Sequence, residues 1–445
     1  MILDDQLPEL EMLRAVEANL QLRADTSFSQ LVVAAQNYDL PIHRWFKFKE
    51  SFSPQLLKTV VDVTYPTLPA TLSILDPFVG VGTTLLAAQD LASKDVAIQA
   101  VGIERNPFIA FAARTKVNWA SIDSNRLVER GEQAVRSANH LRPTLPALTS
   151  IRTGRCISRH NSMRLIAIRD AIRRIADGPT RDALLLGLAA SVEPLSRTRK
   201  DGRALRIVDR PHSPVSATLR KKWWEIASDC RSQAVKKAKL CTSVVIEGDG
   251  RVPSLLGVKP TSIDLVFTSP PYPNNIDYNE VYKLELWLLG FVDDVSDFLN
   301  LRRQTFRSHP TCAIPSPGED FTFELEQGQL RSLLGPILDR AKHEAWRHRL
   351  FIGYFSDMWT SLKGVHECLK IGGHAVFVVG NSLHGGSDSA YLVPTDLLVA
   401  RMAQCLGFEI RASLIARTLK RRLAGNHFLR ESIIILRKPD GRSAR

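Results

Sequence analysis

Hydrophobic and polar positions follow two periodicities along this chain. Short apolar runs that end at Gly, Pro, Asp or Glu predict buried strands. Stretches with a 3.6-residue repeat lie between them and predict amphipathic helices that cover a sheet. This alternation predicts an α/β fold with a mostly parallel sheet. The predicted strands are 72–75, 98–104, 243–249, 263–267, 374–382, 411–420 and 431–438.

Local residue signals mark several helix ends. Ser53 and Pro54 form an N-cap followed by proline at the first helical position. Another helix is predicted to begin at Thr83, directly after a glycine-rich turn. An amphipathic helix over 352–370 is expected to end at Gly372 and Gly373, which would form its C-cap.

Changes in these patterns divide the chain into four segments. The middle segment shows helical patterns, no convincing strand series and much of the positive charge. The last segment resumes the sheet and ends in two runs that predict an antiparallel pair. The segments are a mostly helical preface (1–40), a first half of the sheet (41–118), a basic helical insert (119–240) and a second half of the sheet (241–445).

The amino-acid composition indicates a polyanionic partner. The 445 residues are 44% hydrophobic and 24% charged, as in an ordinary soluble protein, but the net charge is +13. Such an excess favours nucleic acid as a partner, and a merely basic surface is the alternative. Two basic segments are candidates for phosphate contacts or, equally, solvated charge runs. They contain Arg197, Arg199, Lys200 and Arg203, and then Lys420, Arg421, Arg422 and Arg430; a loop with Arg302, Arg303 and Arg307 is a further candidate.

The remaining composition argues against several classes of protein. The six cysteines form no CxxC motif, so we expect free thiols in a reducing cytosol and no metal site. The acidic N-terminus lacks the basic region of a signal peptide. No apolar stretch approaches the roughly 20 residues of a membrane helix. We therefore expect a cytoplasmic protein.

A glycine-rich loop, DPFVGVGTT at 76–84, follows the first predicted strand. Gly80 and Gly82 would let a ligand approach the backbone beside a helix N-terminus. Glu104 ends the next strand, where an acid can bind ribose hydroxyls. The loop lacks a third glycine and a Walker lysine, which argues for a nucleoside cofactor without a pyrophosphate. Asp249 ends a later strand and could reach the adenine or simply close an Asx turn.

A second corner, Thr268-Ser269-Pro270-Pro271-Tyr272, follows the strand 263–267. The prolines end the strand and leave carbonyls, a hydroxyl and an aromatic ring at its carboxyl end. In open α/β sheets this edge binds ligands. The corner offers acceptors and a stacking face without a general base or metal ligand. It suits a nucleobase whose exocyclic amine is modified.

Together, DPFVGVGTT and TSPPY resemble the amino-methyltransferases of DNA, which use S-adenosylmethionine to methylate cytosine N4 or adenine N6. FSPQL at 52–56 resembles the methionine-side cofactor motif of that family, and the resemblance covers 43–118 and 241–437. It implies a Rossmann-like class I sheet with an antiparallel last strand and a helical insert. The cofactor-binding residues that it implies are Phe52, Ser53, Asp76, Pro77, Phe78, Gly80, Gly82, Thr83, Thr84, Glu104 and Asp249.

The resemblance also implies how the TSPPY corner acts. The Ser269 side chain and the Pro270 carbonyl would accept the two amine protons, while Tyr272 stacks on a base flipped out of double-stranded DNA. Catalytic residues would be Ser269, Pro270, Pro271 and Tyr272, with Asn274, Asn275, Asp277 and Tyr278 extending the pocket.

Several alternatives stay open. Serine at the first position of this motif favours cytosine N4, since Asp or Asn is more usual for adenine N6. RNA methylation and a catalytically silent adaptor are the other functions to weigh. The insert 119–240 is a candidate recognition region, although it precedes Asp249. A restriction or defence-system partner is a further candidate.

Overall fold

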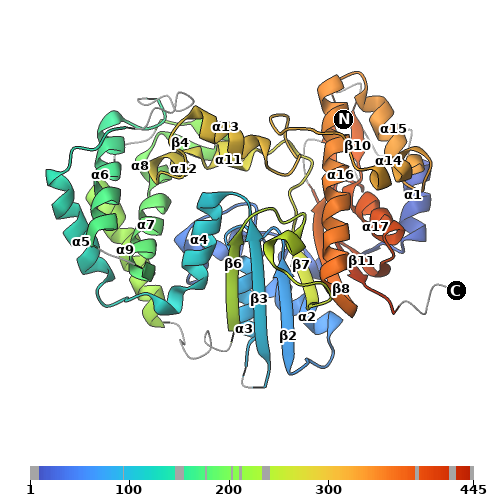
Figure 1. Cartoon of the computed structure of the whole chain (residues 1–445), viewed down its shortest axis with the longest axis horizontal. Coiled ribbons are helices and arrows are strands. Elements are labelled where there is room, and N and C mark those ends of the chain that lie inside the picture. Colours follow the sequence, from blue (N-terminus) through green and yellow to red (C-terminus); the bar gives the residue numbers. More distant parts are fainter. Residues whose placement is uncertain are drawn as a thin grey trace.

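A computed structural model describes residues 10–93, 95–145, 155–175, 178–201, 204–209, 213–232, 241–385, 390–419 and 427–440. It shows one large sheet covered by helices, with a lobe of helices on one side (Figure 1). The sheet has eight strands in the order β1-β11-β12-β8-β7-β2-β3-β6. Their bounds are β1 (Arg23–Ala24), β2 (Thr71–Asp76), β3 (Ala97–Glu104), β6 (Cys241–Glu247), β7 (Ile263–Thr268), β8 (Leu369–Gly380), β11 (Glu409–Thr418) and β12 (Arg430–Arg437).

Strand directions confirm the predicted fold class. From β6 through β3, β2 and β7 to β8, all neighbours are parallel. Strand β12 is antiparallel to both β8 and β11, as predicted for the last strand. Because β2, β3, β6 and β7 run in one direction, their carboxyl ends meet at one edge of the sheet. That edge brings Asp76, Glu104 and Thr268 close together, although they are far apart in sequence.

Helices cover both faces of the sheet. On one face, α2 and α3 pack on Leu72 and Ile74 of β2. The opposite face carries Leu75 and packs against α16 and α17. Alternate residues of one strand thus enter two cores, as the pleat requires. These helices are α1 (Leu10–Asn19), α2 (Pro54–Thr64), α3 (Thr83–Leu91), α4 (Pro107–Val117), α14 (Glu319–Glu326), α15 (Arg331–Ala341), α16 (Ala345–Cys368) and α17 (Thr395–Cys405).

The helix starts predicted at Ser53 and Thr83 are confirmed. The Ser53 side chain accepts a hydrogen bond from the Gln55 N–H, and Pro54 is the first residue of α2. Gly82, with φ of 88°, precedes Thr83 in a left-handed conformation that favours glycine. The local signals were sufficient here because caps act within a single turn.

The basic insert contributes most of the lobe on the left of Figure 1. Its elements are α5 (Leu127–Ser137), α6 (Arg159–Ile175), α7 (Gly178–Ala190), α8 (Val192–Leu195), β4 (Thr198–Asp201), β5 (Ala204–Ile207) and α9 (Val215–Ser232). Trp223 fills its centre, and a Cβ on Gly131 or Gly187 would lie within 2.4 or 2.6 Å of its ring. The same core includes Trp45 and Trp287, so it extends past the limits of the insert.

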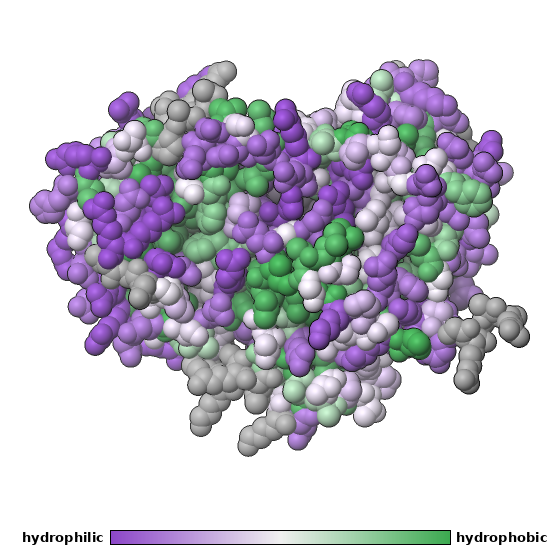
Figure 2. Space-filling model, in the orientation of Figure 1, coloured by the Kyte–Doolittle hydropathy of each residue, from purple (hydrophilic) through white to green (hydrophobic). Residues whose placement is uncertain are grey.

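The lobe also takes in three later helices, α11 (Tyr278–Val281), α12 (Lys283–Leu288) and α13 (Val295–Arg303). A short ladder pairs β9 (Ser382–His384) with β10 (Tyr391–Val393). Figure 2 shows apolar surface gathered in the middle of this face, between the lobe and the elements at the right. None of the helices in the described ranges combines the length and hydropathy of a membrane crossing.

Two predictions about secondary structure are wrong. Gly372 and Gly373 do not cap a helix, because α16 ends at Cys368 and β8 begins at Leu369. Both glycines pair instead with Lys438, beyond β12, through the Gly372 N–H and the Gly373 carbonyl (2.8 and 2.9 Å). The insert is not purely helical either, since β4 and β5 form an antiparallel hairpin with Asp201 opposite Ala204.

Arg430 is the centre of a buried ion-pair cluster rather than a phosphate contact. Its guanidinium is fully buried and donates to Asp396 at 2.7 Å and to Glu17 at 2.9 Å. Asp396 is also fully buried and accepts from the Ser432 hydroxyl at 2.8 Å. The cluster joins α1, α17 and β12. The predicted contact of Arg430 with DNA is therefore corrected, because no solvent-facing atom remains.

Removing this guanidinium should be costly. In Arg430→Met, the buried Asp396 carboxylate loses its cationic partner, so the free energy of unfolding should fall by about 3–5 kcal/mol. Lys342→Ala is the control, because Lys342 pairs with Asp339 on the exposed surface, where an ion pair adds little to stability. Urea unfolding monitored by circular dichroism measures both losses. Equal losses in the two variants would contradict the role of the cluster.

Candidate active site

Two adjoining cavities lie at the carboxyl ends of the parallel strands. The first is formed by the glycine-rich loop, the ends of β3 and β6 and the loop after α13. The second extends from the TSPPY corner toward β9 and the ends of β11 and β12. The two cavities are neighbours because they share part of their lining. The shared residues are Glu50, Ser51, Phe52, Ser269 and Tyr278.

The structure brings most of the predicted cofactor residues to the first cavity. Those that line it are Phe52, Pro77, Phe78, Gly80, Thr83, Glu104 and Asp249, joined by Ser269 and Pro271 of the corner. The predicted residues that line neither cavity are Ser53, Asp76, Gly82 and Thr84. Ser53, Asp76 and Thr84 are buried. Ser53 caps α2, the Thr84 hydroxyl donates to Asp76 across the glycine-rich loop, and Gly82 turns the chain into α3.

Close backbone approaches shape the first cavity. Gly80 has φ of 52°, and a Cβ there would lie 3.1 Å from the Phe48 ring. A Cβ on Gly250 would lie 1.7 Å from the Pro77 carbonyl oxygen. The turn after β6 therefore touches the glycine-rich loop, and only glycine permits that contact. Apolar walls complete the cavity, with the Phe78 and Phe306 rings edge to face at 5.5 Å.

Asp76 connects the glycine-rich loop to the strand that carries the TSPPY corner. Its buried carboxylate accepts hydrogen bonds from the Thr268 hydroxyl (2.7 Å), the Phe78 N–H (3.0 Å) and the Thr84 hydroxyl. Burial raises the pKa of Asp76 to about 6, against the lowering effect of these donors. The carboxylate holds both motifs at one edge of the sheet.

Glu104 lines the first cavity with a carboxylate that lies among backbone N–H groups. One oxygen accepts the Asn106 N–H at 2.8 Å. Burial raises the pKa of Glu104 to about 7, while the neighbouring backbone N–H groups of Asn106, Gly80 and Arg105 lower it. Such a group can accept hydrogen bonds from a ligand and loses its charge near neutral pH.

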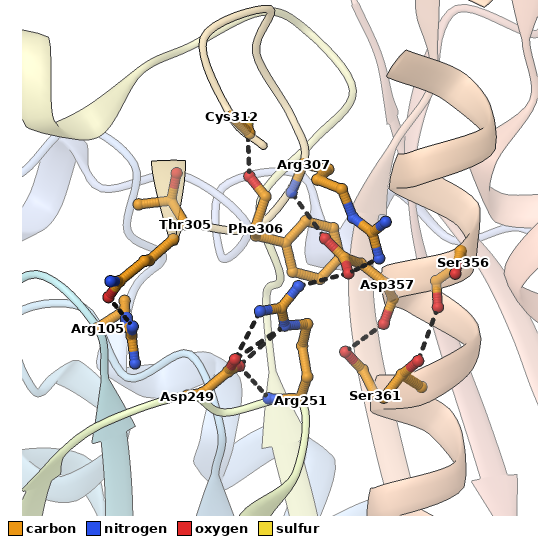
Figure 3. A network of polar contacts seen from close by, with 12 residues as sticks. Arg105, Asp249, Arg251, Thr305, Phe306, Arg307, Cys312, Ser356, Asp357 and Ser361 are labelled. Carbon is orange, nitrogen blue, oxygen red and sulfur yellow. Dashed lines mark hydrogen bonds and ion pairs between the residues drawn. The ribbon is translucent and has the colours of Figure 1, made fainter. Parts of the chain in front are cut away.

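A polar network fixes Asp249, which also lines the first cavity (Figure 3). Arg251 holds the Asp249 carboxylate with distances of 2.6–3.1 Å and also reaches Asp357 at 2.5 Å. Asp357 in turn binds the Arg307 guanidinium and accepts its backbone N–H at 2.8 Å. Arg251 lowers the pKa of Asp249 despite its burial. Arg307 is therefore part of this internal network, and its predicted contact with DNA is corrected.

The structure shows the Asx turn at Asp249, and the contact with adenine stays a prediction. The Asp249 Oδ1 accepts the Arg251 N–H at 3.1 Å, which is an Asx turn. The side chain also lines the first cavity. It can meet a ligand while its position is set by the turn.

The TSPPY corner forms the partition between the two cavities. Ser269 lines both, whereas Pro270 and Tyr272 line only the second. The Ser269 hydroxyl lies 3.3 Å from the Tyr272 hydroxyl. A Cβ on Gly380 would lie 2.7 Å from the Tyr272 ring, so the ring fits there because Gly380 has no side chain. Burial and the charge of Glu431 raise the pKa of Tyr272, which keeps the phenol neutral.

The carbonyls of the corner differ in their partners. The Tyr354 hydroxyl donates to the Pro271 carbonyl at 2.9 Å, which fixes the loop against α16. No donor among the described residues reaches the Pro270 carbonyl. The corner therefore presents one acceptor carbonyl beside a hydroxyl and an aromatic ring.

Some residues after the corner line a cavity, and others support the loop. Asn274 lines the second cavity, and Tyr278 lines both. Asn275 and Asp277 line neither. The Asp277 carboxylate accepts from the Arg302 guanidinium (2.5 Å) and the Thr311 hydroxyl (3.2 Å). The Arg302 side chain therefore helps to shape the loop, and its contact with DNA stays a prediction.

On the basic hairpin, some of the side chains predicted to contact phosphate are exposed, and another is buried. Arg197 and Arg199 are exposed, and the alternation of the strand turns Thr198 and Lys200 inward. The Lys200 ammonium pairs with buried Glu285 at 2.5 Å. It also lies over the rings of Phe46 and Tyr282, at 4.7 and 4.5 Å from their centroids. The predicted contact of Lys200 with DNA is corrected for this reason. Lys420, Arg421, Arg422 and Arg203 lie outside the described residues.

Several cavity residues escaped the sequence analysis. Glu50 lines both cavities and accepts from the Tyr282 hydroxyl at 3.2 Å, and burial raises the pKa of this acid. Ser51 shares a hydrogen bond with the Thr83 hydroxyl at 2.8 Å. Glu50 and Ser51 directly precede the FSPQL motif, and this position was the sequence signal that could have identified them. No sequence signal pointed to Asn279, because only the fold brings it into the cavity that Glu104 lines.

The described residues contain no group of three or more His, Cys, Asp or Glu side chains placed to hold a metal ion. All six cysteines are free, and five of them are buried.

Comparison with known proteins shows distant similarity to type II methyltransferases. The chain is 25% identical to Type II methyltransferase M.AvaI from Nostoc sp., over 94% of this chain and 91% of that protein. It is 24% identical to M.BsoBI from Geobacillus stearothermophilus, over 97% and 93%. No family model matches. The rRNA methyltransferase AviRa from Streptomyces viridochromogenes aligns over 87% of this chain and 85% of its own, with 10% identity and a TM-score of 0.28.

The bond from Thr268 to Asp76 can be tested without changing the shape of the core. Thr268→Val removes the hydroxyl, so the free energy of unfolding should fall by about 1–3 kcal/mol as the buried carboxylate loses a donor. Thr115→Val is a matched control, because the buried Thr115 hydroxyl bonds only the Phe111 carbonyl of its own helix at 2.9 Å. Urea unfolding at pH 8, where Asp76 is ionised, compares the two. A loss no larger than that of the control would contradict the proposed link.

Proposed function

We propose that this chain is an S-adenosylmethionine-dependent DNA methyltransferase that acts on the exocyclic N4 amine of a flipped cytosine. The observation that carries the proposal is the position of Ser269. It lies in the wall between a cavity suited to a nucleoside and a second cavity that contains an aromatic ring and acceptor oxygens. Distant similarity to type II methyltransferases over nearly the whole chain supports the same activity.

The first cavity fits S-adenosylmethionine. Phe78, Ile103 and Phe306 offer apolar walls for a purine, and Glu104 offers a carboxylate for ribose hydroxyls. Among the described residues, no partner reaches the buried amide nitrogen of Asn279, as expected where a ligand supplies the acceptor. When bound, the cofactor supplies a methyl group activated by a sulfonium. The residues of this chain then need only to place an amine in line with it.

The second cavity would hold the target base. An exocyclic amine is a poor nucleophile because its lone pair is delocalised into the ring. The Ser269 hydroxyl and the unoccupied Pro270 carbonyl can accept its two N–H groups, which turns the lone pair toward the first cavity. The Tyr272 ring, supported by Gly380, supplies a face for stacking. Since a base inside a duplex cannot reach this cavity, it must be flipped out.

Ser269 also bears on the choice of base. A neutral hydroxyl can accept one amine hydrogen while it donates to another group, such as the Tyr272 hydroxyl at 3.3 Å. The resemblance associates serine at this position with cytosine N4. We therefore place cytosine ahead of adenine, and N6-methyladenine as a product would overturn that choice.

DNA binding would use the surface around the second cavity. Arg197 and Arg199 are exposed on the hairpin of the lobe and can reach phosphates. The lobe, with residues 119–240 as its main part, is the proposed recognition region. Its core is continuous with α12, which follows the TSPPY corner in sequence. The lobe is thus attached to the catalytic half of the sheet.

The product identifies the reaction. Plasmid DNA incubated with the purified chain and S-adenosylmethionine should yield N4-methylcytosine after nucleoside digestion and mass spectrometry. N6-methyladenine would replace the cytosine assignment with adenine. Absence of any methylated nucleoside on DNA, with RNA methylated instead, would overturn the DNA substrate.

The same assay assigns the activity to the TSPPY corner. We expect Ser269→Ala to lower kcat by about 100-fold, since an acceptor placed for the transition state is lost. Tyr272→Ala should weaken DNA methylation by about 10- to 100-fold through lost stacking, whereas Tyr272→Phe keeps the ring and most of the activity. Each variant should bind S-adenosylhomocysteine like the wild type. Unchanged methylation by Tyr272→Ala would exclude this site.

Cofactor affinity should depend on pH through Glu104. The free carboxyl has a pKa near 7, and ribose hydroxyls donate best to its ionised form. Affinity should therefore rise as pH increases from 6 to about 7 and level off above 8. At pH 6 the affinity should be about tenfold lower than its plateau, because the Glu104 carboxyl must lose its proton before the ligand binds. Calorimetric titration with S-adenosylhomocysteine measures it, and Glu104→Gln should bind weakly at every pH without this slope.

A further inference from the structure

Asn279 has an amide whose orientation is fixed by its neighbours. Asn106 caps α4, where its Oδ1 accepts the Ile109 N–H at 3.0 Å. The Asn106 Nδ2 must therefore be the group that faces Asn279, and it donates to the Asn279 Oδ1 at 2.7 Å. Since an amide oxygen is committed there, the Asn279 Nδ2 has to point elsewhere. Its identity as a donor follows from this chain of bonds.

That Nδ2 group is buried and without a partner among the described residues. Asn279 is 1% exposed and lines the first cavity. An unsatisfied buried donor is costly, so native proteins rarely keep one without a ligand or an ordered water. The backbone of Asn279 is fixed as well, because its N–H donates to the Asp277 carboxylate at 3.0 Å. The Asn279 amide is thus held in place, in a residue that lines the first cavity.

Asn106 holds this donor beside an acceptor. Its backbone N–H bonds the Glu104 carboxylate at 2.8 Å while its side chain bonds Asn279. One residue therefore contacts both Glu104 and Asn279, which line the same cavity with a carboxylate and an amide. A hydroxyl can donate to the first and accept from the second at once. Two adjacent hydroxyls on one sugar match this pair.

We propose that Asn279 is a ribose-binding residue, and that Asn279 and Glu104 together recognise the vicinal diol of an adenosyl ligand. The assignment rests on the proposed function for the identity of the ligand, but its test does not require methyl transfer. Asn279 belongs to α11, seven residues beyond Tyr272. The segment that stacks on the base would therefore also bind the cofactor, so each ligand helps to order the wall of the other cavity.

Calorimetric titration with adenosine, 2′-deoxyadenosine, 3′-deoxyadenosine and S-adenosylhomocysteine tests this assignment. The wild type should bind adenosine about tenfold more tightly than at least one deoxyadenosine. Asn279→Ala should weaken adenosine and S-adenosylhomocysteine by about tenfold and bring the adenosine-to-deoxyadenosine ratio close to that of a single remaining contact, about threefold. Asn279→Asp keeps the acceptor for Asn106 but places an anion beside Glu104, so it should bind still more weakly.

The controls separate recognition from folding. Asn300→Ala, at an exposed site on α13, should bind all four ligands like the wild type. Should Asn279→Ala unfold, Asn279→Asp decides, because it retains the bond to Asn106. The proposal is overturned if Asn279→Ala weakens the binding of adenosine and both deoxyadenosines equally, or does not weaken it at all. A wild type that discriminates these ligands but methylates no DNA would refute the proposed function and leave the ribose assignment intact.

Discussion

One buried carboxylate joins the two halves of the candidate site. Asp76 ends β2 and accepts the Thr268 hydroxyl from β7, while its own loop is closed by the Phe78 N–H and the Thr84 hydroxyl. These groups come from segments nearly 200 residues apart in the chain. A carboxylate in the core is stable only when donors surround it. The glycine-rich loop and the TSPPY corner are consequently fixed relative to each other, and the two cavities share a wall.

That shared wall explains why so few reactive groups are needed. Ser269, Pro270 and Tyr272 offer acceptors and a stacking face, and the neighbouring cavity can seat a methyl donor. In the proposed function, placement of the two ligands would supply the catalytic effect, so rigid support would matter more than a strong base. The support comes from Tyr354 behind Pro271 and from Gly380 under the Tyr272 ring.

The lobe is connected to this wall by polar contacts within an apolar core. Lys200 of the hairpin reaches Glu285 on α12 and lies over Tyr282, whose hydroxyl donates to Glu50 in both cavities. A buried pair of this kind is a weak source of stability but is sensitive to position. It relates the basic hairpin to the cavities, which matters if the lobe contacts the DNA that presents the target base.

The sequence alone determined the features that depend on neighbouring residues. Helix starts at Pro54 and Thr83, the antiparallel last strand and the placement of Glu104 and Ser269 at strand ends follow from caps, periodicity and proline, which act over a few residues. The tertiary structure decided which charges face solvent. Lys200, Arg307 and Arg430 resemble the exposed Arg197 in sequence, yet each is paired with a distant acid. Asn279 became a candidate ligand contact only once Asn106 fixed its amide, because burial and hydrogen-bond partners are set by residues far along the chain.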